Sequence, residues 1–465
     1  MNSDKVKKIS LGVSVIIAMI LFLCLYLLGY GYDYVEDNDE KALNTKITAP
    51  ISMKNNILRE NKNIYYRYNP GKMSKVYINV FSTKDKDGKE YNFSDFDMIA
   101  AWNKDFNPVL DANVQFADKE EQPKEKSMSN PNASIRVRGN PQVPLKSYRI
   151  KLMDGFEGYE GQSVFNPDKN SNDPSRIANK LAHDLIMDLK HISGFRTSFL
   201  ELYIRDDSLT GEDSEFHSYG LYTHIEQPNK AYLRSRGLDE NGSLYRAEDF
   251  SFRLTSHIKN VDNPDYDEQT FEEVLVIREG KDHSKLVQML QDINDESKDF
   301  EEVFHTYFNE DNYLTWLSIN ILLGNADGMT EGFLLYSPSN SLGFYLLPWD
   351  FDSIFRWMED ESSVSDIYDS MKNVVLHRKY LSMDGSLEKL KARMEELVSD
   401  AFSPDRVKSL IKHYRPILLE MMNRYPDNVI SPISLNEQMA YLKQIDERIL
   451  INYNEFIKRY ETGDD

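Results

Sequence analysis

Two acidic residues, Asp327 and Asp350, are spaced so that their carboxylates could act together. Asp327 just precedes a strand predicted over 333–336, and Asp350 just follows a strand predicted over 343–347. If these strands pair antiparallel across the turn at 337–341, the start of the first lies about 5 Å from the end of the second. Two carboxylates this close repel unless they share a cation or a proton. The spacing favours Mg²⁺ and phosphate chemistry, in which one acid orients the acceptor and another holds metal.

The alternative for each acid is ordinary turn chemistry, because Asp and Gly are common loop residues. The run from Pro348 to Asp352 is less easily explained in that way, since it sets two acids beside Trp349 and Phe351. A charge next to large apolar side chains is costly without a partner. Asp352 is therefore a second candidate metal ligand beside Asp350.

Cations gather on two neighbouring predicted strands. Side chains alternate along a strand, so cations two residues apart share a face. Four cations on paired strands, within an acidic protein, indicate a bound anion such as phosphate. The alternative, which stays open, is that they line the solvent-exposed side of an amphipathic sheet. The strands are 133–140 and 146–152, and the cations are Arg136, Arg138, Arg149 and Lys151.

Helices must support the hairpin that carries the two acids. The apolar run 312–323 has Leu314, Leu317 and Ile321 at helical spacing, and Gly324 follows it as a C-terminal cap would. After the hairpin, three further helical patterns are bounded by prolines. They lie at 386–402, 405–425 and 435–460.

A helix is also predicted over 172–189, where Asp173 can cap the N-terminus and Pro174 can begin the first turn. Apolar residues at helical spacing from Ile177 to Leu189 predict its buried face. The polar residues of this helix are then expected to be exposed or to face the other lobe. They are Arg176, Lys180, His183 and Asp184.

The N-terminus predicts a membrane anchor. Residues 1–8 contain lysines and form a predicted cytoplasmic tail, and 9–32 are an uncharged run that would span roughly 36 Å as a helix. Acids follow this run, so the main domain is expected outside the cytoplasm. A cleaved signal peptide is the alternative, but its apolar core would be shorter and would end in small residues. Residues 33–62 are a predicted polar tether.

The composition restricts the remaining classes of function. The chain has 465 residues and a single cysteine, so it forms no intrachain disulfide and its core must hold the fold. The roughly 400 residues after the tether suffice for two or three lobes. A formal net charge of -21 repels nucleic acid, which argues against nucleic-acid binding. The nine histidines show no metal-ligand spacing.

Five segments, in order, resemble the spore-coat-protein-H (CotH) kinase family. The resemblance covers roughly residues 72 to 455, and its motifs are specific only in combination. It implies an α+β, atypical two-lobed protein-kinase-like fold, with a mainly β N-terminal lobe at 63–255 and a helical C-terminal lobe at 256–465. The segments are 135–140 (IRVRGN), 146–152 (KSYRIKL), 179–185 (NKLAHDL), 219–226 (YGLYTHIE) and 347–352 (LPWDFD).

The same resemblance implies residue roles. Asp327 matches the catalytic-loop aspartate, and Lys151 matches the strand lysine that grips phosphate. Asp350, with Asp352 beside it, would hold Mg²⁺ or Mn²⁺. The residues expected to bind ATP are Arg138, Arg149, Lys151 and Glu226, the last of which follows the strand that would join the lobes.

One departure from the family pattern concerns the metal. Gly332 stands where the family has an asparagine that would be a second metal ligand. The expected function is a membrane-anchored kinase that moves the γ-phosphate of ATP to a hydroxyl of an envelope or coat protein. The alternative, which Gly332 favours, is a pseudokinase that serves as a binding or assembly module of the envelope or coat. A metal-dependent hydrolase is a third, weaker alternative, because it would need more ligands.

Overall fold

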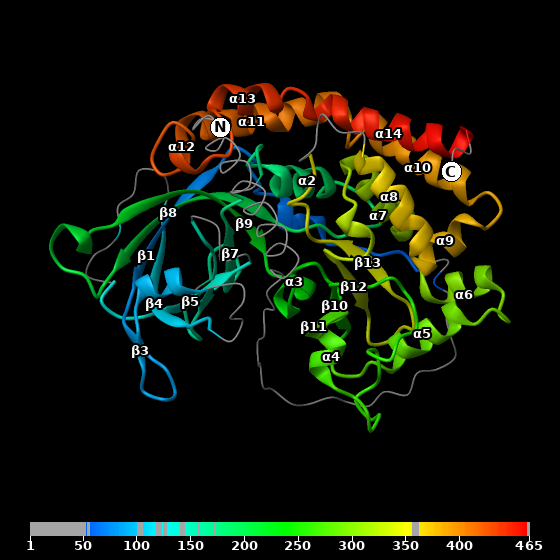
Figure 1. Ribbon diagram of the computed structural model, residues 1–465, viewed down its shortest axis with the longest axis horizontal. Coiled ribbons are helices and arrows are strands. Elements are labelled where there is room, and N and C mark those ends of the chain that lie inside the picture. Colours follow the sequence, from blue (N-terminus) through cyan, green and yellow to red (C-terminus); the bar gives the residue numbers. More distant parts are fainter. Residues whose placement is uncertain are drawn as a thin grey trace, which may run out of the picture.

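The computed structural model describes residues 53, 56–99, 106–117, 123, 128–139, 145–156, 158–170, 173–355 and 362–462. Within these residues the fold contains a closed barrel, a four-stranded sheet, a small two-stranded sheet (β2, Thr83–Lys84; β3, Glu90–Tyr91) and a set of helices. Figure 1 shows the barrel on one side and the four-stranded sheet on the other. The C-terminal helices run along the top of both.

The barrel has the strand order β1-β4-β5-β6-β7-β9-β8. Neighbouring strands are antiparallel except β1 and β8, which close the barrel in parallel. Alternate residues point inward, as in β5, where Ile135 and Val137 are buried and Arg136 lies outside. The strands are β1 (Met73–Val80), β4 (Leu110–Ala117), β5 (Ala133–Arg138), β6 (Ser147–Leu152), β7 (Val164–Asp168), β8 (Thr197–Asp206) and β9 (His217–Glu226).

The second sheet has the antiparallel order β11-β10-β12-β13. It contains the hairpin predicted from the sequence, in which Phe333 pairs with Pro348 and Tyr336 with Tyr345. That prediction is confirmed. The strands are β10 (Ser243–Ala247), β11 (Leu275–Glu279), β12 (Phe333–Ser337) and β13 (Tyr345–Pro348).

Helix α7 (Glu310–Leu323) is the central support of the hairpin. Every residue from Asn312 to Leu323 is buried, and Gly324 ends the helix with a φ of 70°, as its position predicted. The other helices are α2 (Ala178–Ile186), α3 (Lys230–Ser235), α4 (Glu268–Glu272), α5 (Ser284–Asn294), α6 (Phe300–Tyr307), α8 (Ser362–Asn373), α9 (Val375–Leu381), α10 (Ser386–Ser399), α11 (Pro404–Met421), α12 (Asp427–Ile430), α13 (Leu435–Tyr441) and α14 (Ile445–Thr462).

Helix α2 is shorter than predicted and buried on every side. Its polar residues were expected to be exposed or to face the other lobe; they are not exposed, because segments from the C-terminal part of the chain cover them. Lys180 pairs with Asp184 at 3.1 Å, and Tyr414 of α11 donates to the same carboxylate. Arg176, just before the helix, pairs with Asp427 of α12 at 3.0 Å.

The two-lobed kinase-like fold expected from the resemblance is wrong. The N-terminal strands form a closed seven-stranded barrel, and the second sheet draws strands from both sides of residue 255, since β10 pairs with β11 and β12. One large hydrophobic cluster also joins Leu181 of α2 and Phe199 of β8 to Leu397 of α10. The described residues are therefore not divided into a β lobe and a helical lobe at that boundary.

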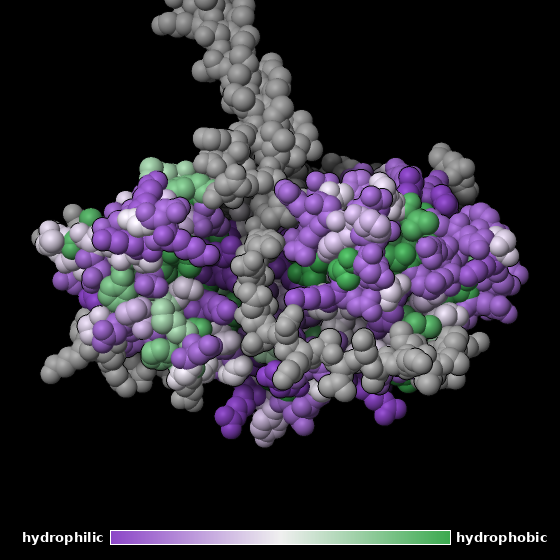
Figure 2. All heavy atoms as spheres, turned by 90° about the horizontal axis from the view of Figure 1, so that it is seen from below, coloured by the Kyte–Doolittle hydropathy of each residue, from purple (hydrophilic) through white to green (hydrophobic). Residues whose placement is uncertain are grey.

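The described part of the chain contains no helix that is both long and apolar enough to cross a membrane. The predicted tail at 1–8 and the predicted anchor at 9–32 lie outside the described residues. Of the predicted tether, residues 53 and 56–62 are described, and Met53 and Leu58 are buried against the domain. Seen from below, the described surface is mostly hydrophilic, with small separate hydrophobic patches (Figure 2).

Candidate active site

Asp350 is fixed at the open end of the β12–β13 hairpin by backbone hydrogen bonds. Its N–H donates to the Gly332 carbonyl at 2.9 Å, and the Gly332 N–H donates to the Ala247 carbonyl of β10 at 3.2 Å. The next residue, Phe351, donates its N–H to the Asn179 side chain of α2 at 2.9 Å. Asp350 is thus held between the sheet and α2.

The loop that carries Asp327 is tied to the same place. Asp327 begins a single 3₁₀ turn, and its carbonyl accepts the Glu331 N–H at 2.9 Å. The buried Asn325 amide donates to Asn320 of α7 at 2.9 Å and to the Asp350 carbonyl at 3.1 Å. The sequence 325–332 therefore folds back so that Asp327 and Asp350 approach the same side chain, Glu331.

The pKa of Glu331 indicates which acidic residues lie close to it. Burial raises its pKa to about 8, and Asp327, Glu248, Asp350 and Asp249 add to the rise in that order. Like charges disfavour ionisation of a carboxyl group, so these four acids lie near Glu331. The prediction that Asp327 and Asp350 converge at the hairpin's open end agrees with this.

Charged residues of the barrel also shift the pKa of Asp350. It is solvent-exposed, but protein surrounds it closely enough that loss of hydration raises its pKa. Asp168 of β7 raises that pKa further, and Arg138 of β5 and Arg246 of β10 lower it. The end of the barrel and the end of the four-stranded sheet therefore meet at Asp350.

Arg138 is oriented by its neighbours on the barrel. Its Nη1 donates to the Asp168 carboxylate at 3.0 Å, and the Ser147 hydroxyl donates to the other oxygen at 3.1 Å. Ser147 is the residue of β6 that lies opposite Arg138 in the β5–β6 pairing. The structure thus brings Arg138, one of the predicted phosphate ligands, close enough to Asp350 to lower its pKa.

Lys151 and Arg149 are placed differently. Lys151 is exposed on the outer face of the barrel, four residues along β6 from Ser147. At about 3.4 Å per residue, this separates them by roughly 14 Å. The charges that act most strongly on Asp350 do not include Lys151 or Arg149. The structure therefore does not join Lys151 to the two acids.

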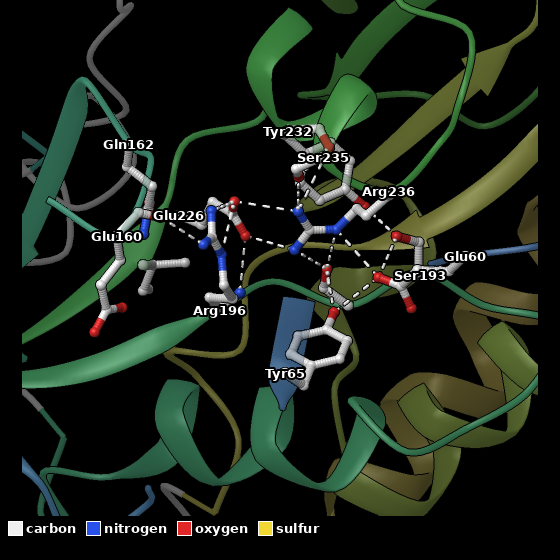
Figure 3. Close-up of polar contacts among 12 residues, drawn as sticks. Glu60, Tyr65, Glu160, Gln162, Ser193, Arg196, Glu226, Tyr232, Ser235 and Arg236 are labelled. Atoms are coloured by element: carbon white, nitrogen blue, oxygen red, sulfur yellow. Dashed lines mark hydrogen bonds and ion pairs between the residues drawn. The ribbon is translucent and has the colours of Figure 1, made fainter. Parts of the chain in front are cut away.

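Glu226 lies in a buried ion-pair network, shown in Figure 3. Arg196 binds its carboxylate from one side, with Nε to Oε1 at 3.1 Å, and Arg236 binds it from the other, with Nη1 to Oε1 at 3.1 Å. Burial alone would raise the Glu226 pKa, but Arg236 and Arg196 outweigh it and lower the pKa to about 2. Both carboxylate oxygens are occupied, which gives Glu226 a structural role.

The far side of this network reaches the predicted tether. Arg236 donates Nε to Glu60 at 3.1 Å, and Tyr65 and Ser193 donate to the same oxygen at 2.8 and 2.9 Å. A small pocket borders the network, but neither Asp327 nor Asp350 lines it. Its lining residues are Gly161, Gln162, Ser163, Val164, Arg196, Glu226, Gln227, Asn229, Ala231 and Tyr232.

Whether the acids fit a metal ion depends on what else supplies ligands. Among the residues that the structure describes, no three acidic, histidine or cysteine side chains are placed so that they could hold a metal ion by themselves. Asp352 is exposed, and its N–H donates to the Asp350 carboxylate at 3.3 Å. Mg²⁺ usually takes one or two carboxylates together with phosphate oxygens and waters. The acids fit a cation that binds together with phosphate.

Position 332 lies directly beside Asp350. A Cβ added to Gly332 would be 3.1 Å from the Asp350 Cβ, and the φ of Gly332 is +64°. An asparagine tolerates this left-handed conformation better than most residues. The asparagine that the resemblance expects at this position would thus stand next to Asp350, and this chain lacks it.

Sequence reasoning missed three residues of the site: Asp168, Arg246 and Glu248. Asp168 ends β7, a strand that escaped prediction because Pro167 argues against a strand interior. Arg246 lies in the short strand β10, and Glu248 directly follows that strand. The signal that could have found Arg246 is a lone arginine in a strand next to the acidic pair Glu248 and Asp249.

Comparisons with known proteins cover this whole region. A family model described as "CotH kinase protein" matches residues 135–448. The chain is also similar to "Inner spore coat protein H" of Bacillus subtilis (strain 168), with 23% identity over 318 residues, which are 64% of this chain and 82% of that protein. The family match includes Arg138, Asp327 and Asp350.

Proposed function

The chain belongs to the CotH kinase protein family, and from this premise we propose that it transfers the γ-phosphate of ATP to a hydroxyl group of another protein. The observation that carries the proposal is the meeting of Asp327 and Asp350 at Glu331, with Arg138 of the barrel close to Asp350. Acids for metal and acceptor, opposite a cation for phosphate, are the groups that phosphoryl transfer needs.

Each residue has a distinct part in the proposed reaction. Asp327 accepts a hydrogen bond from the acceptor hydroxyl and takes its proton as the oxygen forms a bond to the γ-phosphorus. The bond from that phosphorus to the β–γ bridging oxygen breaks, and ADP leaves. Arg138 binds the phosphates and offsets their charge. Asp350 would hold Mg²⁺ or Mn²⁺, which when bound supplies charge neutralisation at the transferred group.

The substrate class follows from the relative. Because the similar Bacillus subtilis protein is named an inner spore coat protein, we propose that the substrates of this chain are coat or envelope proteins and that it is located with them. Its strongly acidic character, with a formal net charge of -21, favours partners with basic segments. The same charge argues against nucleic acid as a partner.

Nucleotide binding is the first test of the proposal. ATP with Mn²⁺ should stabilise the purified protein against heat, by about 2.7 kcal/mol when the nucleotide is at 100 times its Kd. Asp350→Asn should lose the Mn²⁺-dependent part of this shift. Asp384→Asn, the same change at an exposed aspartate of the helical region, should keep it. A wild-type protein with no ATP-dependent shift, with or without Mn²⁺, would argue against a nucleotide-dependent function.

A pseudokinase is a second candidate because Gly332 removes the expected asparagine beside Asp350. A pseudokinase would capture its coat or envelope partner and leave it unmodified. Asp327→Ala should then retain partner capture, together with every cellular effect of the wild type. Loss of those effects with capture intact would favour the kinase instead.

A further inference from the structure

Arg246 lies on the strand next to the hairpin that ends at Asp350. It is the fourth residue of β10 and pairs with Leu334 of β12 in the hairpin that ends at Asp350. Its neighbour Ala247 accepts the Gly332 N–H at 3.2 Å, and Gly332 in turn accepts the Asp350 N–H. The guanidinium is close enough to Asp350 to lower its pKa, as is that of Arg138. Two cations from different sheets therefore act on the charge of one carboxylate.

The Arg246 guanidinium is not saturated by protein partners. Glu248 binds its Nη2, whereas Nε is buried and has no hydrogen-bond partner among the described residues. Arg236 provides a contrast, because its Nε, Nη1 and Nη2 all donate to protein oxygens. A buried guanidinium with an unmade bond is costly, so this arrangement suits a group that is completed by a ligand.

Arg138 and Arg246 are held in the same manner. Each is paired with one carboxylate of its own neighbourhood, Asp168 at 3.0 Å for Arg138 and Glu248 for Arg246. Each side chain retains some exposure, 14% for Arg138 and 16% for Arg246. A single carboxylate fixes the orientation of a planar guanidinium and leaves its other donors for a second anion.

We propose that Arg138 and Arg246 form a two-arginine clamp that binds the polyphosphate of a nucleotide from both sides of Asp350. Asp168 and Glu248 are then positioning residues that orient the two guanidinium groups. The proposal rests on the proposed function only in taking a nucleotide as the ligand. The clamp also explains how a polyphosphate can enter a site that contains Asp327, Glu248 and Asp249, because the two cations offset part of the repulsion.

The test compares ATP, inorganic tripolyphosphate and adenosine as ligands of the full chain, by competition with a fluorescent nucleotide. Arg246→Gln should weaken ATP and tripolyphosphate about tenfold or more and leave adenosine unchanged, because a charge-assisted hydrogen bond is lost. Arg246→Lys should lose less, since an ammonium keeps the charge but not the fork. Arg234→Gln, at a two-thirds exposed arginine that pairs with Glu240, should bind like wild type.

Glu248→Gln tests the positioning role and covers the case in which Arg246→Gln fails to fold. It keeps both arginines, so we expect a higher KM for ATP with little change in kcat. Equal affinity of wild type, Arg246→Lys and Glu248→Gln for tripolyphosphate would overturn the clamp, as would a wild type that binds neither phosphate ligand. Phosphate binding that responds to these variants, in a protein that transfers no phosphate, would reject the kinase proposal and support the clamp.

Discussion

Charged residues on β5, β7 and β10 shift the pKa of Asp350. These neighbours account for most of the proposed chemistry. Asp327 and Asp350 both raise the pKa of Glu331, and Arg138 and Arg246 both lower the pKa of Asp350. The sequence predicted that the two aspartates lie at the hairpin's open end, because Asp327 precedes the first strand and Asp350 follows the second. It was not sufficient to place Arg246, since nothing local indicates which strand lies beside the hairpin.

Substitutions of Gly332 test whether position 332 belongs to the proposed metal site. Gly332→Asn should increase the Mn²⁺-dependent thermal stabilisation by ATP, because its amide oxygen would lie beside Asp350. Gly332→Ala is the matched control, because it adds a Cβ at the same φ of +64° and has no ligand oxygen. Both variants should lose about 1 kcal/mol or more of stability without ligand. An equal response of the two variants to Mn²⁺ would remove position 332 from the metal site.

The lowered pKa of Glu226 predicts that the stability of the protein depends on pH. Its pKa falls from 4.5 to about 2 on folding, so its contribution is fully present above pH 4.5 and is lost as the pH drops toward 2. The shift corresponds to about 3 kcal/mol. Glu226→Gln should lower the free energy of unfolding by about 3 kcal/mol or more at pH 7, because Arg236 stays buried without its partner.

Urea unfolding across this pH range checks the Glu226 prediction. The difference between wild type and Glu226→Gln should shrink as the pH falls from 4.5 toward 2. Glu240→Gln is the control, since Glu240 pairs with Arg234 at the surface and should matter little. A difference that is constant with pH would mean that the two arginines do not stabilise the ionised carboxylate.

At the scale of elements, local patterns predicted what local chemistry determines. The hairpin and the αL cap at Gly324 follow from alternation and turn residues, and both are present. Lys151 was placed on the correct strand, but its distance from Asp350 depends on which end of β6 faces the hairpin. The polar residues of α2 were expected either at the surface or facing the other lobe. They are covered by α11 and α12, which are more than 200 residues away in the chain.

Substitution of Asp427 tests whether α12 fixes the barrel to α2. It pairs with Lys169 at 2.9 Å and with Arg176 at 3.0 Å, and its other oxygen accepts the Leu221 N–H at 2.6 Å. Asp427→Asn leaves two buried cations without a counter-charge, and we expect a loss of about 3–5 kcal/mol. Thermal unfolding should show a much lower Tm for this variant than for Asp384→Asn. Equal Tm values would show that α12 does not fix the barrel to α2.

At the scale of the whole molecule, the resemblance predicted the family but not the architecture. Family membership depends on short motifs that remain in order along the chain. Barrel closure depends on the parallel pairing of β1 with β8 and on the antiparallel pairing of β7 with β9, contacts between distant segments that no local pattern specifies. The barrel and the four-stranded sheet meet where Asp168, Arg138 and Asp350 approach one another, so the site belongs to the fold as a whole.

Transfer of labelled γ-phosphate from ATP tests the central claim most directly. The purified full chain, with Mn²⁺ and a coat protein as acceptor, should label that acceptor or itself. Asp350→Asn should reduce the rate by about 100-fold or more, and Asp384→Asn should not. No labelling by the wild type, or equal labelling by Asp350→Asn, would contradict the claim that this protein is a kinase with its site at the hairpin's open end.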